Sequence, residues 1–179
     1  MQSGIITDYI QAVPDQQPAP VSKDPQPKGK KEEIGPLIDV MMQTLSCVNQ
    51  LQIQSHLIHF NYEAPNFLGV HKQLKKQYEM HLKQFDKLGE QIRSLDYMTV
   101  MCNKGLTGCY KKFKHCTSYD PCDMLCTYVG NLEDAGMLAK KLGDVARKQK
   151  APDVEHYAAE LVGEMFDTAW LFKATLRRI

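Results

Sequence analysis

Two histidines and two carboxylates stand out as residues that could bind a metal ion. His59 and His71 lie on either side of a short break between two helix-like segments. Asp86 and Glu90 are spaced i, i+4, so they share one face of a helix. Imidazole nitrogens and carboxylate oxygens suit iron or zinc. These residue types indicate a metal site, and the alternative is a pair of buried histidines with two solvated acids.

The spacing of these residues does not let all four meet within one chain. His71 and Asp86 are 15 residues apart, which is about 22 Å of rise along one helix. A metal–ligand bond is only about 2 Å long. A second subunit must therefore supply part of any shared site. In a twofold dimer of antiparallel hairpins, the histidine end of one helix meets the carboxylate end of its mate, and two equal sites result.

Four long segments with helical periodicity are expected to position these residues. Apolar residues recur at three- and four-residue intervals over 37–58, 66–95, 125–146 and 154–176. The pattern does not alternate as it would in a strand, so four amphipathic helices are predicted. Each segment has a proline just before it or in its first turn, where the missing N–H costs little, namely Pro36, Pro65, Pro121 and Pro152.

The links between the segments predict the topology. Residues 61–65 and 149–151 form short links, which give antiparallel hairpins, whereas residues 96–120 form a long one. This order of connections is that of a ferritin-like bundle. The predicted fold is therefore all-α, a ferritin-like four-helix bundle with a long crossover between helices two and three. The sequence holds no Glu-x-x-His pair of the kind that binds iron inside one such bundle.

The N-terminal part of the chain differs in composition from the rest. Five of the nine prolines fall within residues 14–27, which predicts an extended linker. Ahead of it lies a short apolar patch that could dock onto the domain or a partner, or remain a frayed tail, made of Ile5, Ile6, Tyr9, Ile10 and Val13. We expect residues 1–33 to form a flexible, Pro-rich extension and residues 34–179 to form the bundle.

The composition excludes several classes of protein. The 179 residues carry 22 basic and 21 acidic side chains, which is not the balance of a strongly basic nucleic-acid binder. No apolar run is long enough for a transmembrane helix, and Asp8 argues against a signal peptide. Six cysteines are too few for a disulfide scaffold. We therefore expect a cytoplasmic protein with reduced thiols and no membrane partner.

Two stretches of the chain resemble the signature of the Dps mini-ferritins, the DNA-binding proteins from starved cells. Residues 59–71 read HFNYEAPNFLGVH and residues 86–90 read DKLGE. The family pattern is H-W-N-x-x-G-x-x-F-x-x-x-H, followed by D-x-x-x-E at the same spacing. The last segment, which contains Trp170, is also similar to the family's last helix. The resemblance covers about residues 36–178.

The resemblance implies a hollow shell of twelve subunits with ferroxidase sites between them. Such sites oxidise Fe(II), typically with hydrogen peroxide, and the shell stores the ferric mineral and protects against oxidative damage. By this resemblance His59 and His71 of one subunit bind iron together with Asp86 and Glu90 of its partner. The implied partners are further copies of the chain, iron and peroxide.

Three residues depart from the family pattern. Lys75 stands where the family has an acid four residues after the second histidine, and a cation there repels a metal ion. Lys75 could instead pair with Glu79 at i+4. Phe60 replaces the usual tryptophan and Ala64 the usual glycine. An alternative function is therefore a shell with an impaired ferroxidase site that binds DNA or another partner.

The predicted crossover is rich in lysines and cysteines. Between residues 97 and 119 it contains four lysines and no acid, the lysines being Lys104, Lys111, Lys112 and Lys114. These form either a basic patch for nucleic acid or simply solvated side chains. A zinc or thiolate site is one interpretation of His115, Cys116, Cys122 and Cys126, and free thiols are the other.

The N-terminal extension does not resemble a DNA-binding arm. Residues 1–33 contain four lysines and five acids, so DNA binding through this segment is expected to be weak. A third alternative for the whole chain is an unrelated four-helix protein, which would form no dodecamer. His56 and His81 are interpreted as packing or surface residues.

Overall fold

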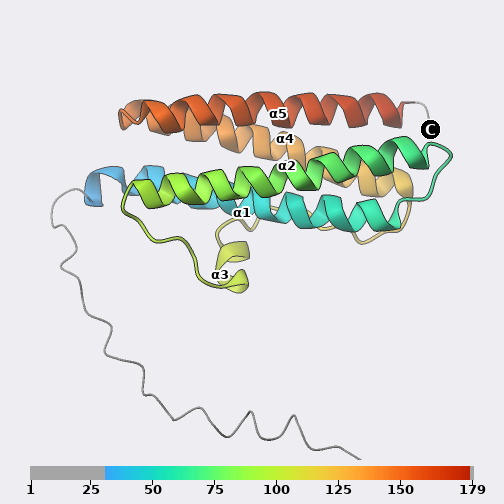
Figure 1. The fold of residues 1–179 in the computed structure, drawn as a ribbon, viewed down its shortest axis with the longest axis horizontal. Coiled ribbons are helices and arrows are strands. Elements are labelled where there is room, and N and C mark those ends of the chain that lie inside the picture. Colours follow the sequence, from blue (N-terminus) through green and yellow to red (C-terminus); the bar gives the residue numbers. More distant parts are fainter. Residues whose placement is uncertain (1–30, 178–179) are drawn as a thin grey trace, which may run out of the picture. The chain divides into compact units, whose positions relative to one another are not determined.

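A computed structural model of the chain describes residues 31–177, and these residues form helices and connecting segments but no strand. The helices are α1 (Lys31–Asn61), α2 (Phe67–Ser94), α3 (Asn103–Gly108), α4 (Pro121–Lys148) and α5 (Pro152–Leu176). The long helices α1, α2, α4 and α5 lie side by side (Figure 1). The predicted N-terminal extension lies almost wholly outside the described residues.

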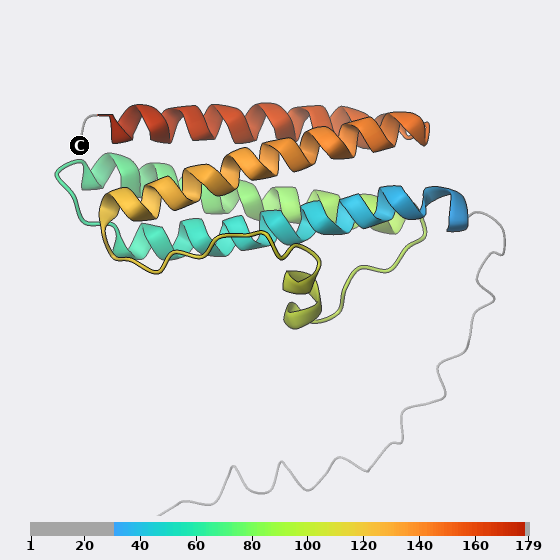
Figure 2. The ribbon, with the colours of Figure 1, turned by 180° about the vertical axis from the view of Figure 1, so that it is seen from behind.

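The connections follow the predicted order. A short turn joins α1 to α2, another joins α4 to α5, and residues 95–120 run from the end of α2 back to the start of α4 (Figure 2). Each short turn makes an antiparallel hairpin. The prediction of an all-α, ferritin-like four-helix bundle with a long crossover is therefore confirmed.

The first helix begins earlier than the sequence suggested. Pro36 lies inside α1, because the helix begins at Lys31. The prediction that Pro36 marks the first turn is therefore wrong. A proline this close to the helix start removes only one intrahelical hydrogen bond, so α1 tolerates it. Pro121 and Pro152 do stand in the first turns of their helices.

The crossover contains a helix that the sequence analysis did not predict. α3 is only six residues long, too short to show a hydrophobic period. The Cys102 thiol caps it by accepting a hydrogen bond from the Gly105 N–H at 3.3 Å. A Cβ at position 105 would lie 2.6 Å from Val100 Cγ1. Glycine therefore lets the Val100 side chain approach the α3 backbone. The buried Leu106 anchors α3 to the core.

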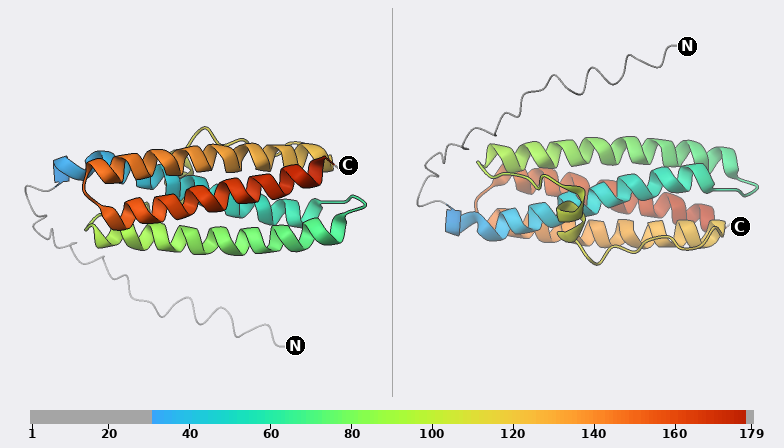
Figure 3. Two further views of the ribbon diagram at one scale, coloured as in Figure 1. Left: turned by 90° about the horizontal axis from the view of Figure 1, so that it is seen from above. Right: turned by 90° about the horizontal axis from the view of Figure 1, so that it is seen from below.

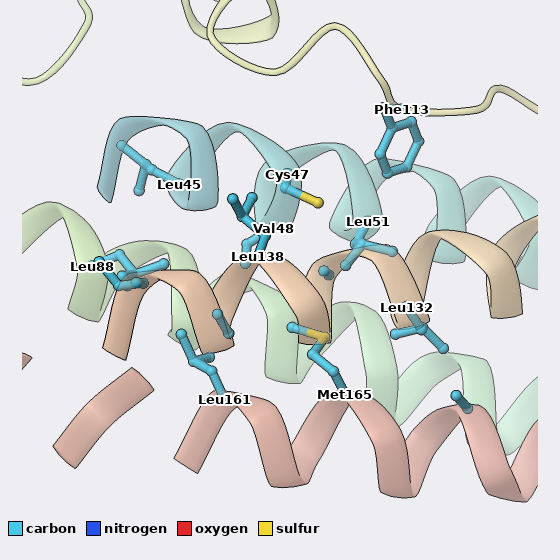
Figure 4. Close-up of a cluster of buried hydrophobic side chains, with 14 of the residues drawn as sticks. Leu45, Cys47, Val48, Leu51, Leu88, Phe113, Leu132, Leu138, Leu161 and Met165 are labelled. Carbon is cyan, nitrogen blue, oxygen red and sulfur yellow. The ribbon is translucent and has the colours of Figure 1, made fainter. Parts of the chain in front are cut away.

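The core is one continuous apolar cluster along the bundle axis. Figure 4 shows side chains from α1, α2, α4 and α5 meeting in it, including Leu45, Val48, Leu51, Leu88, Leu132, Leu138, Leu161 and Met165. Phe113, from the crossover, packs against the same cluster. Burial of these side chains supplies most of the free energy that holds four amphipathic helices together.

Side-chain amides fasten the crossover to the bundle. The Asn131 side chain on α4 pairs with the backbone of Lys114 in both directions, accepting from its N–H at 3.0 Å and donating to its C=O at 2.7 Å. Gln54 on α1 donates to the same carbonyl at 2.9 Å. Gln50 donates to the Tyr110 carbonyl at 3.1 Å. The segment 110–114 is therefore held in place across α1 and α4 (Figure 3).

A line of hydrogen bonds crosses the centre of the bundle at His81. The ring lies fully buried, with Nδ1 2.7 Å from Gln84 Oε1 and Nε2 2.8 Å from the Tyr128 hydroxyl. The Gln84 amide nitrogen donates to Glu164 at 2.6 Å, so its oxygen accepts from His81 Nδ1–H, and Nε2 accepts from Tyr128. Burial lowers the pKa of His81 to about 4. The neutral ring thus links α2, α4 and α5, as a packing histidine should.

This arrangement predicts an acid-sensitive contribution to stability. Because the folded pKa of His81 lies below its ordinary value of 6.5, the contribution is complete above pH 6.5 and is lost as the pH falls toward 4. Lowering the pH from about 7 to about 4.5 should destabilise the wild type by roughly 2 to 3 kcal/mol more than a His81→Asn variant. Urea unfolding followed by circular dichroism, at one protein concentration, measures the difference. His156→Asn, at an exposed position, is the control and should show the wild-type pH dependence.

The amide contacts predict that Asn131 controls the mobility of the crossover. An Asn131→Ala variant leaves the Lys114 backbone without this partner, which costs about 2 kcal/mol and so opens the segment roughly thirtyfold more often. Trypsin should therefore cut after Lys111 or Lys112 much faster than in the wild type, as measured by limited digestion and mass spectrometry. Asn61→Ala is the control, since that side chain bonds only its own helix. Equal cutting rates in both variants would contradict the role of Asn131.

Candidate metal centre

The two histidines meet across the turn between α1 and α2. His59 lies in the last turn of α1 and His71 near the start of α2. Each ring binds the backbone of the other residue, with His59 Nδ1 at 2.8 Å from the His71 carbonyl oxygen and His71 Nδ1 at 3.0 Å from the His59 carbonyl oxygen. The rings stack with their centroids 3.7 Å apart. The structure therefore brings these two predicted residues together.

These reciprocal bonds decide which nitrogens are free to bind a metal. A carbonyl oxygen can only accept, so Nδ1 of His59 and of His71 must carry a proton. In the neutral rings Nε2 then keeps its lone pair, which is the form a metal ion needs. Carbonyl groups that orient metal-binding imidazoles in this way are common second partners of ligands. Residue types alone do not predict these carbonyl partners, because they are backbone atoms that only the turn brings close.

Neighbouring aromatic rings and the turn itself hold the histidine pair. Tyr78 lies edge-on to His59 with ring centroids 5.4 Å apart, and Phe67 lies 4.9 Å from the His71 ring. The buried Tyr62 hydroxyl donates to Asn66 Oδ1 at 2.8 Å and closes the turn. That bond uses the Asn66 side chain, which stands at the N-cap of α2 but makes no capping hydrogen bond.

The two predicted carboxylates lie elsewhere on the surface of the same chain. Asp86 and Glu90 are exposed on α2 and line a hollow of about 500 Å³, beside Leu45 of α1 and Leu106 of α3. Their 15-residue separation from His71 corresponds to about 22 Å along α2. Within residues 35–177 no three His, Cys, Asp or Glu side chains are close enough together to hold a metal ion. One chain therefore does not bring the predicted ligands together, and we refer to the histidine pair and the carboxylate pair as the two predicted half-sites.

Apolar side chains are exposed around and between the half-sites. Ile53, Leu57 and Phe60 follow one stripe of α1, and Phe60, beside His59, is 65% exposed. On α2, Leu82 lies one turn before Asp86 and is 57% exposed. Exposed apolar side chains gathered near polar groups are typical of a protein–protein interface.

Comparison with known proteins agrees with this fold. The family model for the ferritin-like domain matches residues 38–179. The chain belongs to the ferritin-like domain family.

Solved structures of Dps proteins share the fold of this family member. The Dps protein from Bacillus brevis superposes with a TM-score of 0.78 and 17% identity, covering 83% of this chain and 99% of that one. Dps from Thermosynechococcus elongatus gives a TM-score of 0.77 and 14% identity over 82% of this chain and 93% of that one. A Vibrio cholerae Dps, described as a member of a broad superfamily of ferritin-like diiron-carboxylate proteins, gives 0.75 and 16% over 82% and 92%.

A curated relative matches over a shorter stretch. The DNA protection during starvation protein of Mycolicibacterium smegmatis is 33% identical over 57 residues, which is 32% of this chain and 31% of that protein's length. Together with the structures, this match confirms the resemblance to the Dps mini-ferritins. Within the described residues, no helix is long and apolar enough to cross a membrane.

One departure from the Dps pattern, Ala64, causes no backbone strain in the turn. Ala64 replaces the expected glycine in the turn between α1 and α2. In the described part of the chain, only Asp96 and Lys150 among the non-glycine residues have a positive φ. Ala64 therefore has an ordinary backbone conformation, in which a Cβ is tolerated.

The cysteines do not assemble a second metal site in this bundle. All six cysteines are free. The Cys116 thiol lies 3.4 Å from the Gln54 amide nitrogen and donates to the Met124 carbonyl at 3.8 Å. Since no cluster of metal ligands forms among the described residues, the hypothesis of a zinc site from His115, Cys116, Cys122 and Cys126 finds no support in the single chain.

Lys75 is the departure with a direct electrostatic effect on the half-site. It stands one turn from His71, and its ammonium lies 4.0 Å from Glu79. Both side chains are more than half exposed, so water screens the pair and it contributes little to stability. Glu79 therefore does not fix the lysine, which carries its positive charge one turn along α2 from His71.

This charge predicts that Lys75 lowers the affinity for Fe(II). A Lys75→Gln variant should bind Fe(II) about two- to fivefold more tightly, since removing one screened charge near the surface is worth about 1 kcal/mol or less. Anaerobic equilibrium dialysis of the sized oligomer measures this affinity. The exposed neighbour Lys76, changed to glutamine, is the matched control. An equal gain in both variants would show a general charge effect and no specific role for Lys75.

Proposed function

We propose that this ferritin-like protein is a Dps-type mini-ferritin that oxidises Fe(II) between subunits. It stores the ferric iron in a hollow dodecamer and so protects against oxidative damage. The observation that supports this most strongly is the reciprocal bonding of His59 and His71, which leaves two neutral Nε2 atoms free to bind an ion.

The missing half of each site comes from a second copy of the chain. In this arrangement a twofold axis passes beside α2 near Tyr78, midway between His71 and Asp86. The histidine pair of one subunit then lies beside the carboxylates of the other. Leu82 and the exposed stripe of α1 would then be buried between the subunits. Isologous symmetry makes two equivalent sites in each dimer.

The two half-sites contribute different chemistry. His59 and His71 hold Fe(II), the substrate, as neutral ligands that fix its position. Asp86 and Glu90 of the partner subunit supply hard anionic oxygens, which favour Fe(III) over Fe(II) and so help to drive the oxidation. Hydrogen peroxide accepts one electron from each of two Fe(II) ions, its O–O bond breaks, and two protons from the solvent complete two water molecules.

The free cysteines favour an intracellular location for this reaction. None of the six cysteines forms a disulfide, which favours a reducing compartment such as the cytoplasm. Lys75 supports a second candidate function, because it places a positive charge one turn from His71 on α2. In that case the shell would have lost fast iron oxidation and would serve to bind DNA or another partner.

A subunit-mixing experiment tests whether the iron site is shared. His71→Ala and Asp86→Ala variants should each lose fast Fe(II) oxidation by peroxide, measured as ferric absorbance on the sized oligomer. When both variants are co-expressed, half of the dimers pair one variant with the other. Each mixed dimer regains one intact site, so about a quarter of the wild-type activity should return.

A variant far from the predicted ligands serves as the control for this experiment. An Asp144→Ala variant, at an exposed position of α4, should oxidise iron like the wild type. A site within one subunit predicts no recovery on mixing. Oxidation no faster than buffer from an intact wild-type shell would instead favour the second candidate function.

A further inference from the structure

A third imidazole lies beside the predicted histidine pair. His56 stands one turn before His59 on α1, and the centroids of the two rings are 6.1 Å apart. The His56 ring stacks on Tyr78 of α2 with centroids 4.0 Å apart, and it lies 4.7 Å from the Phe60 ring. The sequence analysis interpreted His56 only as a packing or surface residue. The structure places it at the edge of the candidate metal centre.

Packing accounts for the ring of His56 but not for its nitrogens. A ring that only fills space against Tyr78 and Phe60 could equally be a phenylalanine, which has no polar atoms to solvate. The Nδ1 of His59 bonds a backbone carbonyl, whereas no hydrogen bond joins His56 to another part of the described chain. The His56 side chain is only half-buried. Its nitrogens are therefore uncommitted in the folded subunit.

The proposed iron reaction requires a place for a second ion. Peroxide accepts two electrons and each Fe(II) gives one, so two Fe(II) ions must lie side by side when the O–O bond breaks. Lys75 stands where the family pattern has an acid, so the histidine half-site lacks a carboxylate that could hold another cation. Four rings contact His59, and only those of His56 and His71 have nitrogens that bind metals.

We infer that His56 binds the second Fe(II) of each site, beside the ion that His59 and His71 hold. Metal–nitrogen bonds are about 2 Å long, and the ions of two-metal sites lie about 3.5–4 Å apart. Rings with centroids 6.1 Å apart leave room for such a pair, with one ion on each ring. His56 does not complete a site for a single ion, because no three such side chains of the described chain come close enough together.

The second ion decides what peroxide becomes. With both positions filled, each Fe(II) gives one electron, the O–O bond breaks, and two protons complete two water molecules. With only the first position filled, one electron breaks the same bond into hydroxide, which takes a proton from the solvent, and a hydroxyl radical, which escapes. This inference rests on the proposed function and adds the residue that keeps its oxidation a two-electron step.

A phenylalanine at position 56 tests the role of the nitrogens. His56→Phe keeps an aromatic ring against Tyr78 and Phe60 but removes both nitrogens. Co(II), a redox-stable substitute for Fe(II), is titrated into the sized oligomer, and its visible absorption counts the bound ions. The wild type should bind two ions per subunit and His56→Phe only one. With Fe(II) and peroxide, spin trapping should detect several-fold more hydroxyl radical from the variant.

A second variant restores a ligand by another route. In the double variant His56→Phe, Lys75→Asp, a carboxylate replaces the cation one turn from His71. This variant should regain the second Co(II) ion and lose the excess radical, whereas damage to packing would not be rescued. His156→Phe, which removes an exposed histidine from α5, is the control and should behave like the wild type.

The other outcomes separate failure of this inference from failure of the proposed function. If His56→Phe binds as many ions as the wild type and releases no more radical, His56 is a packing ring only, and the shared site stands without it. An equal loss in His156→Phe would show a general effect of removing histidines and would also overturn the role of His56. If His71→Ala leaves ion binding unchanged, or the wild-type oligomer binds no ion, the proposed function itself fails and this inference with it.

Discussion

The rise of an α-helix is the constraint on which the proposed iron site depends. His71 and Asp86 stand on the same straight helix, 15 residues apart, and no rotamer change closes a gap of about 22 Å. Each chain can therefore offer only halves of a site. The separation also sets where a twofold axis must pass, and the exposed Leu82 lies close to that place on α2. Assembly and chemistry are thus linked by the geometry of one helix.

Two local features of the folded chain shape the predicted half-sites before a second copy binds. The turn between α1 and α2 brings the carbonyl of each histidine to the other ring, so His59 and His71 orient one another. At the other half-site, the crossover returns over α1 and places Leu106 beside the hollow that contains Asp86 and Glu90. Because the histidine rings are already oriented in the folded chain, little ordering of this pair is left for association with a second copy.

The sequence predicted the structural features that depend on a repeated apolar pattern and missed those that depend on single contacts. Helices of 25 to 31 residues contain many apolar repeats. The sequence could therefore predict the four long helices and the order of the links between them. Pro36 misled because a proline is tolerated so near the start of α1. α3 was missed because six residues show no period. The histidine pair was found by residue type and resemblance, but the backbone bonds that fix its tautomers arise only from the folded turn.

The polar line through the bundle centre argues against an iron site inside the single bundle and so favours the proposed site between subunits. Ferritin-like bundles often hold iron in their core, on carboxylates and Glu-x-x-His pairs. Here the buried imidazole in the core is His81, and both of its ring nitrogens are already occupied by Gln84 and Tyr128. Glu164, at the end of the line, accepts from Gln84.

A metal in this core would have to displace a complete set of hydrogen bonds, and each buried group left without a partner costs about 1 to 3 kcal/mol. In the proposed site, by contrast, His59 and His71 have satisfied Nδ1 atoms and keep Nε2 for a metal ion. The same bonding that stabilises the core thus argues against a metal site there, whereas the proposed site between subunits uses the two Nε2 atoms of rings that are held through Nδ1.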